Sequence, residues 1–370
     1  MERNICTNAS SSLPGVEDLH LEHWAKFPPL QKEISLALGV LTMSVLIVAS
    51  GANIFIITSF IRYRSLRSSS TILALNLSIA DLFMAGVALP LFSLSHIKGD
   101  WIAGDAGCRF YGFIAALVGF VTINTFIAMA MNRFHVFGKD FSWTINRSTQ
   151  SMYKISCLIW ILAVVAATLP FMGFGSYVFE SDGLSCTFDF FTRTTLIRSY
   201  IIFMAVTLYI IPVVLITTCY IFIVIKVYIF EKKHFKQGGL VRFKGKKILN
   251  FEKRVAKITV FTIAMFLLSW TPYCLVALIG QFGNASLITP LVSILPGVFA
   301  KLSTAFNAVT YVCLHSKLRR KLIVTSCKKS PTNNSVELIG IPVRLNTIDQ
   351  NQFLPLGEQA SELWSHHVRL

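Results

Sequence analysis

Seven apolar stretches, each long enough to cross a lipid bilayer, constrain this chain more than any other feature of its sequence. A membrane-spanning helix needs about 20 consecutive apolar residues. A soluble domain carries about a quarter charged residues, whereas charged residues make up only 14% of this chain. The sequence therefore predicts an all-α membrane protein, a seven-transmembrane-helix bundle. The expected spans cover about residues 34–61, 70–95, 108–132, 155–178, 199–225, 258–281 and 287–313.

The positive charges predict how this bundle is oriented. Lysine and arginine follow the first, third, fifth and seventh stretches, which places all of these segments on one side of the membrane. Positively charged loops face the cytoplasm, so we expect a plasma-membrane protein with an extracellular N-terminus. The same placement accounts for the net charge of +16 without a nucleic-acid partner. Basic loops of this kind favour contact with membrane lipid or an acidic protein.

The segments outside the bundle differ in composition. The N-terminal segment is polar and carries a glycosylation sequon at Asn8. Beyond the last span, apolar and basic residues alternate at helical spacing, which predicts a short amphipathic eighth helix on the inner leaflet. Cys327 ends this helix, where a palmitoylated cysteine and a free thiol are equally plausible. The expected divisions are an extracellular segment 1–33, a membrane domain 34–314, the amphipathic helix 315–327 and a disordered cytoplasmic tail 328–370.

Lys301 stands alone in the last apolar stretch, since no other fully charged residue occurs between Lys257 and Lys317. A lysine at mid-membrane adds about 2.5 to 3.5 kcal/mol to the cost of insertion, and such residues are usually functional. A neutral amine in an apolar pocket is a nucleophile that can condense with an aldehyde. We therefore predict that Lys301 is a covalent attachment point. The alternative is a lysine that extends its ammonium to the membrane surface.

Other polar residues within the spans predict a moving bundle. Asn53, Asp81 and Asn307 lie at depths where they could meet, as a hydrogen-bond network or a small cation site. Arg133 ends the third span and Glu252 opens the sixth at the same membrane level. These two form either an ion pair that holds the helix ends together or two unrelated surface charges. Prolines at positions 90, 170, 212, 272 and 296 interrupt the helices and allow kinks.

Two cysteines predict a disulfide on the outer face. Cys108 opens the third span, and Cys186 lies in the loop between the fourth and fifth spans. Both face an oxidising compartment, so we expect them to be bonded. The bond would hold this loop over the mouth of the bundle as a lid and bring Glu180 inwards.

Together these residues resemble a family A G-protein-coupled receptor, and more narrowly an opsin of the invertebrate and cnidarian type. The resemblance covers about residues 34–325. Its specific mark is the segment FAKLSTAFN, in which Lys301 precedes Asn307 by six residues, as the retinal-binding lysine does in opsins. The marks shared with the wider receptor family are Asn53, Asp81, Cys108, Arg133, Trp160, Cys186, Pro212, Tyr220, Trp270, Pro272, Asn307 and Tyr311.

The resemblance implies that 11-cis-retinal is bound to Lys301 as a Schiff base. In vertebrate visual opsins the counterion lies on the third helix, at the position held here by Tyr111. Many other opsins use a carboxylate six residues before the loop cysteine, which is Glu180 here; the alternative is a loop glutamate that faces water. The resemblance also implies that the polyene is lined by Trp270 and Tyr273 and, with less support, by Tyr111, Gly119 and Met204.

For partners, the resemblance implies a heterotrimeric G protein and arrestin. Light would move Trp270, swing the sixth helix about Pro272 and separate Arg133 from Glu252, with Asp81, Asn307, Tyr311 and Tyr220 taking part in the switch. Two residues depart from the family pattern. Asn132 replaces the acidic residue before Arg133, and Ala308 replaces the proline after Asn307.

Three functions remain open at this level. The first is a light-activated G-protein-coupled receptor, which is not an enzyme. The second is a retinal photoisomerase of the same fold, which Ala308 favours. The third is a receptor for a diffusible ligand, in which Lys301 is incidental. The sequence contains no metal-binding cluster, no phosphate-binding glycine loop and no hydrolase triad.

Overall fold

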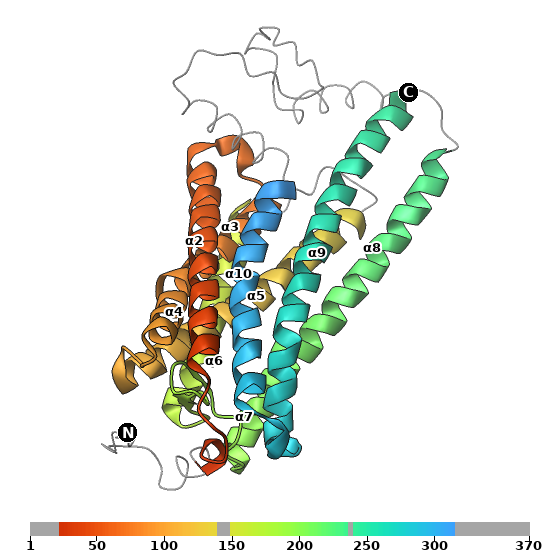
Figure 1. Ribbon diagram of the computed structural model, residues 1–370. Coiled ribbons are helices and arrows are strands. Elements are labelled where there is room, and N and C mark those ends of the chain that lie inside the picture. The colour runs from red at the N-terminus through yellow and green to blue at the C-terminus, as the bar shows by residue number, and fades with distance from the viewer. Residues whose placement is uncertain (1–21, 139–148, 236–239, 315–370) are drawn as a thin grey trace, which may run out of the picture. The chain divides into compact units, whose positions relative to one another are not determined.

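The computed structural model describes residues 22–138, 149–235 and 240–314 (Figure 1). Four expectations fall outside these residues: the glycosylation sequon at Asn8, the amphipathic helix 315–327, the palmitoylation site at Cys327 and the tail 328–370. The interior of the bundle, where the predicted site residues lie, is described.

Over the described residues, seven helical spans are long and apolar enough to cross a bilayer, which confirms the predicted bundle. Four spans contain a single helix, namely α2 (Lys32–Arg62), α5 (Gly104–Gly138), α9 (Leu240–Phe282) and α10 (Pro290–Leu314). The fourth span is α6 (Thr149–Thr168) with the turn η3 (Leu169–Met172). The second and fifth spans are interrupted: α3 (Ser69–Phe83), η2 (Met84–Ala88) and α4 (Leu89–Lys98), then α7 (Thr195–Ala205), η4 (Val206–Ile210) and α8 (Ile211–Phe235). Short turns η1 (Arg64–Leu66) and η5 (Ala285–Leu287) lie in two of the loops.

The interruptions in the second and fifth spans arise from proline. Pro90 and Pro212 each follow a widened π-helical turn, η2 and η4 respectively. Proline has no N–H to donate, and its ring clashes with the carbonyl four residues earlier, which here belongs to Gly86 or Leu208. The widened turn moves that carbonyl away from the ring while the chain stays helical. Pro272 and Pro296 instead lie inside the continuous helices α9 and α10.

One predicted boundary is wrong. The fourth span was expected to reach residue 178, but its helix ends near Pro170, and Gly173 then adopts a left-handed φ of 88°. The sixth span was expected to begin at about residue 258, and the apolar span begins at Thr259, within a helix α9 that itself begins at Leu240. Apolar composition alone extended the fourth span into Tyr177 and Val178, which belong to a strand.

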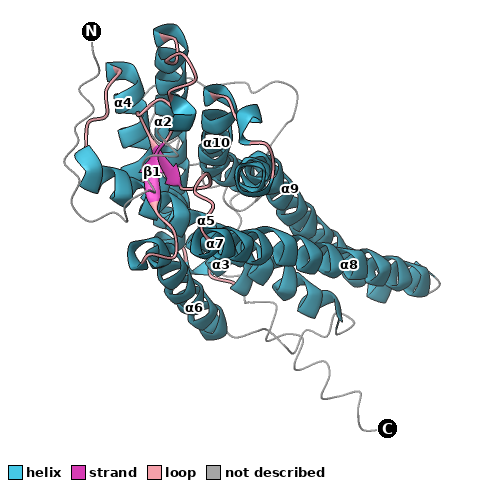
Figure 2. Ribbon diagram, turned by 90° about the horizontal axis from the view of Figure 1, so that it is seen from below, coloured by secondary structure: helices cyan, strands magenta, loops and turns pink. Residues whose placement is uncertain are grey.

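A short hairpin covers the centre of the helices at one end, as Figure 2 shows. Strand β1 (Tyr177–Phe179) pairs antiparallel with β2 (Cys186–Phe188), so that Phe179 lies opposite Cys186. The predicted disulfide is present and joins Cys186 to Cys108 at the start of α5. The hydroxyl of Tyr177 also donates to the carbonyl of Ala167 at 2.8 Å. The hairpin is therefore fastened at both strands, and the turn 180–185 is held over the interior.

Removing this disulfide should release the hairpin. Because the bond joins residues 78 positions apart, its loss typically costs about 2 to 4 kcal/mol of stability. We expect Cys186→Ser to lower the thermal unfolding midpoint of the purified protein, and Cys108→Ser combined with it to lower the midpoint no further. Cys157→Ser is the matched control, since Cys157 is a free, exposed cysteine. Additive losses from the two single variants would contradict a shared bond.

Candidate functional site

A cavity beneath the hairpin brings together residues from the second, third, sixth and seventh spans. It lies between the turn of the hairpin and the middle of α10. Most of its lining is apolar, as in most small-molecule sites. Five of the residues predicted to bind retinal line it, namely Lys301, Glu180, Tyr111, Trp270 and Tyr273. The other lining residues are Met84, Gly112, Ala115, Ala116, Cys186, Thr187, Phe188, Gly297 and Ala300.

Lys301 lines this cavity from the middle of α10. The residue is only 5% exposed. Its Nζ donates to the carbonyl of Gly297, one turn earlier in α10, at 3.2 Å. The same atom lies 4.3 Å from the ring centre of Phe92 and 5.5 Å from that of Tyr111. The amine is therefore held by one carbonyl and two aromatic faces.

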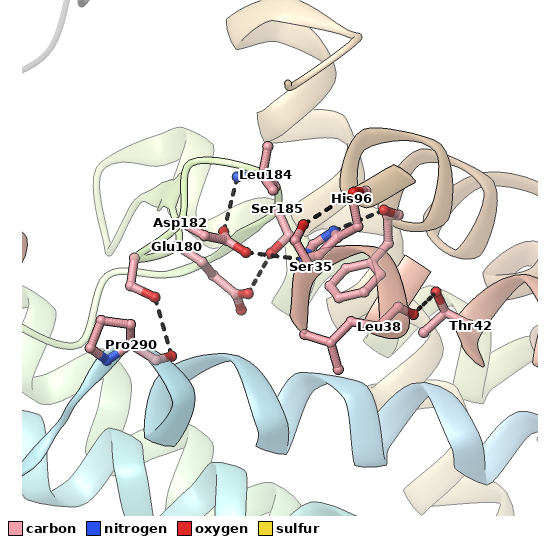
Figure 3. A network of polar contacts seen from close by, with 11 residues as sticks. Ser35, Leu38, Thr42, His96, Glu180, Asp182, Leu184, Ser185 and Pro290 are labelled. Atoms are coloured by element: carbon pink, nitrogen blue, oxygen red, sulfur yellow. Dashed lines mark hydrogen bonds and ion pairs between the residues drawn. The ribbon is translucent and has the colours of Figure 1, made fainter. Parts of the chain in front are cut away.

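Glu180 lines the same cavity from the hairpin, and Figure 3 shows its side chain beside Ser185 and Asp182. It directly follows β1, its backbone N–H donates to the carbonyl of Ser185 at 2.7 Å, and its Oε2 accepts from the hydroxyl of Ser185. A β-carbon added at Gly297 would lie 3.4 Å from Nζ of Lys301 and 3.5 Å from Oε1 of Glu180. The amine and the carboxylate thus face each other across the bare backbone of Gly297.

Burial dominates the electrostatics of Glu180, which is 5% exposed. Loss of water raises the pKa of its carboxyl above the ordinary value, and the charge of Asp182 raises it further. The ammonium of Lys301 and the hydroxyl of Ser185 act in the opposite direction. A carboxylate in this position is stable only beside a cation, which Lys301 supplies.

The aromatic residues form the inner wall of the cavity. Trp270 stacks on Phe266 at 5.4 Å between ring centres, and the hydroxyl of Tyr273 is hydrogen-bonded to that of Thr187 in β2. Gly119 does not line the cavity but lies behind Trp270, where an added β-carbon would be 2.7 Å from the indole ring. Met204 does not line it either and packs, partly buried, against the core of the bundle.

Sequence analysis missed several residues around this centre. Gly297 lies one turn before Lys301, so the helical period could have identified it as the residue whose carbonyl meets the amine. Phe92 and His96, from α4, and Asp182, two residues after Glu180, carry no such signal. They meet the site only through packing of the hairpin against the second span.

The arrangement of seven spans, disulfide, and buried amine and carboxylate matches a known family. The family described as "7 transmembrane receptor (rhodopsin family)" matches residues 52–311. This chain belongs to the rhodopsin family of seven-transmembrane receptors. The family is one of receptors and not of enzymes.

Relatives with known names narrow the position within this family to opsins. The receptor is 32% identical to the Gq-coupled rhodopsin of Mizuhopecten yessoensis over 87% of its own length and 65% of that protein. It is 30% identical to the rhodopsin of Enteroctopus dofleini, over 83% and 69% of the two chains, and 31% identical to the melanopsin of Rattus norvegicus, over 84% and 66%. It thus spans about two thirds of the length of these relatives. The crystal structure of squid rhodopsin superposes with a TM-score of 0.77 at 30% identity, covering 84% of this receptor and 91% of that chain.

Of the three buried polar residues that were expected to form a network, only Asp81 and Asn307 are in contact. The amide of Asn307 lies 3.5 Å from the carboxylate of Asp81. Asn53 does not join them, because its amide donates to the carbonyl of Ala49 in its own helix at 2.9 Å. All three side chains are buried, and one oxygen of each has no hydrogen-bond partner within the described part of the chain.

At the other end of the receptor, Arg133 is buried at 4% exposure. Its charge acts on the hydroxyl groups of Tyr220 and Tyr311, so these three predicted switch residues are close together. The side chain of Glu252 is not among those described, and its pairing with Arg133 stays a prediction. Ala308 is buried and packs with Ile56 and Val312 between the first and seventh spans.

Adding a methyl group at Gly297 should weaken the contact between Glu180 and Lys301. The new β-carbon would stand between the two side chains, in contact with both. In the retinal-reconstituted receptor we expect Gly297→Ala to lower the pH at which the visible band gives way to an ultraviolet one, by less than about one unit. Gly86→Ala is the control, because a β-carbon at Gly86 meets nothing within 4 Å. An unchanged transition would contradict the facing of the two groups across Gly297.

Proposed function

We propose that this receptor is a light-activated opsin that binds retinal through Lys301 and signals to a heterotrimeric G protein. Its similarity to rhodopsins and melanopsins implies a retinal chromophore. The observation that carries the proposal is the buried amine of Lys301 facing the buried carboxylate of Glu180 inside an apolar cavity.

The residues present fit this chromophore. Retinal is an aldehyde on an apolar polyene, and a lysine amine with apolar and aromatic neighbours suits both parts. When bound, retinal supplies light absorption and isomerisation. The protein supplies Lys301 as the attachment point and Glu180 as the balancing charge. Trp270 and Tyr273 line the cavity, where a change in polyene shape would press on their side chains. We propose the 11-cis isomer in the dark.

The path from the cavity to the cytoplasmic face runs along α9. Trp270 lies in the cavity wall, and Pro272 interrupts the hydrogen bonding of the same helix two residues later. A push on Trp270 would therefore bend α9 at a point where the helix is already weakened. We propose that this motion opens the cytoplasmic side near Arg133 to a G protein, with the N-terminus outside the plasma membrane. The Gq class is proposed from the relative described as Gq-coupled.

The test is expression in cultured cells with 11-cis-retinal, followed by two measurements. The purified protein should show a visible band in the dark that changes on illumination, and intact cells should show a light-dependent rise in calcium. Cells without retinal are the control. A photosensitive pigment without a calcium or cyclic-nucleotide response would favour a photoisomerase. Absence of any pigment would favour a receptor for a diffusible ligand.

A further inference from the structure

A second pair of ionisable groups is buried beside the site (Figure 3). Nε2 of His96, near the end of α4, lies 3.0 Å from Oδ2 of Asp182 in the hairpin turn, and the two side chains are 0% and 2% exposed. The geometry is not that of a well-aligned hydrogen bond, so the contact is mainly electrostatic. His96 lines no part of the cavity that holds Lys301 and Glu180.

The hydrogen bonds of His96 fix where its protons lie. Its Nδ1 is 2.9 Å from the carbonyl oxygen of Phe92, which can only accept, so Nδ1 carries a hydrogen. If Nε2 were then unprotonated, its lone pair would face a carboxylate oxygen. That repulsion is removed only by a proton on Nε2 or on Asp182. Besides the hydrogen on Nδ1, the pair therefore holds one further proton, and its net charge is zero.

The surroundings favour the charged form of this pair. His96 lies in the last turn of α4, which ends at Gly99, and the negative end of a helix dipole stabilises an imidazolium. The imidazole also stacks on Phe92 at 3.9 Å between ring centres. Asp182 also accepts a hydrogen bond from the N–H of Leu184 at 2.9 Å. From α2, Ser35 donates its hydroxyl to the carbonyl of His96 and brings no charge.

Other charged groups on the neighbouring elements do not replace this pairing. Lys98 in α4 and Glu33 in α2 are exposed to solvent. The buried ring of Phe92 contacts both the amine of Lys301 and the imidazole of His96. The two pairs are thus one aromatic ring apart.

This proximity matters because Asp182 is a second carboxylate beside the counterion. Its charge acts on Glu180. With both carboxylates ionised and only Lys301 to balance them, the buried site would hold an excess negative charge, which a low-dielectric interior disfavours. The imidazolium of His96 removes that excess.

We propose that His96 is a positioning residue for the counterion: it neutralises Asp182 and leaves Glu180 as the single net negative group facing Lys301. The consequence for the chromophore rests on the proposed function, whereas the pair itself is a property of the retinal-free protein. The two can therefore be tested separately.

The retinal-free test is thermal unfolding of the purified protein between about pH 5 and about pH 8, the range in which a histidine changes charge. His96→Phe keeps the ring stacking and leaves Asp182 a lone buried anion, so its midpoint should fall relative to wild type as the pH rises. Asp182→Asn keeps the acceptor for Leu184 and leaves a lone buried imidazole, so its midpoint should fall relative to wild type as the pH is lowered. The double variant holds neither ionisable group and should show neither of these pH-dependent losses.

The retinal-bound test follows the pH at which the visible band gives way to an ultraviolet band. His96→Phe adds a net negative charge near Lys301 and should raise that pH by about one unit or more. Asp182→Asn and the double variant should leave it near the wild-type value. A purely structural role for His96 would not produce a shift that Asp182→Asn cancels.

Parallel pH dependences in the two single variants, or no rescue in the double variant, would overturn the pairing. If His96→Phe yields no folded protein, recovery of folded protein in the double variant supports the pairing, and failure of the double variant contradicts it. If wild-type protein forms no pigment, the proposed function fails while the retinal-free result still decides on the pair.

Discussion

Lys301→Ala should abolish the visible absorption band of the retinal-reconstituted receptor completely. Alanine has no amine to condense with the aldehyde, and among the residues that line the cavity Lys301 alone carries one. Lys301→Arg should give the same loss, since a guanidinium keeps the charge without a nucleophilic amine. The measurement is the dark spectrum after incubation with 11-cis-retinal and purification.

A matched control distinguishes loss of attachment from loss of folding. Lys98→Ala removes an exposed lysine at the end of α4 and should leave the pigment yield unchanged. The retinal-free Lys301→Ala protein should still purify as a folded receptor, because the buried carboxyl of Glu180, left without its cation, can hold a proton. A visible, photosensitive band that persists in well-folded Lys301→Ala would refute covalent binding at this residue.

Glu180→Gln should convert most of the dark pigment to an ultraviolet-absorbing form at neutral pH. Glutamine keeps the size of the side chain and its hydrogen bond with Ser185 but supplies no negative charge to face Lys301. An opposite charge at this range is worth about 1 to 3 pH units of proton affinity. We therefore expect the transition from visible to ultraviolet absorption to move to lower pH by about that amount.

The same variant makes a prediction for the retinal-free protein. Burial raises the pKa of Glu180 above the ordinary 4.5. In the pH window between 4.5 and this raised pKa, the folded state therefore holds a proton that the unfolded state has released. Stability then falls as the pH rises through the window. Glu180→Gln should remove this part of the pH dependence of the unfolding midpoint. Glu33→Gln, at an exposed glutamate, is the control and should not.

An unchanged spectrum and an unchanged pH transition in Glu180→Gln would assign the counterion to another group. Asp182 is then the next carboxylate to test, because it lies two residues away in the same turn and its charge already acts on Glu180. The Asp182→Asn variant, which also tests the pairing of Asp182 with His96, provides that measurement.

Much of the site could be predicted from the sequence of one segment at a time. Lys301 was identified by its isolation in an apolar stretch, since a charge in lipid must have a partner or a function. The disulfide followed from two cysteines on the oxidising side. Met204 and Gly119 were less accurately placed, because an apolar side chain on a helix packs against neighbours whose rotation the sequence does not give.

The sequence by itself determined the seven spans and the amine within the seventh, because hydrophobic length and a charge in lipid are properties of one segment. Only the tertiary structure decided that Glu180 faces that amine across Gly297, and that Asp182 faces His96. These contacts join a loop to helices distant in the chain. Their energies depend on burial and on separations of a few ångströms, which arise only once the hairpin is packed against the bundle.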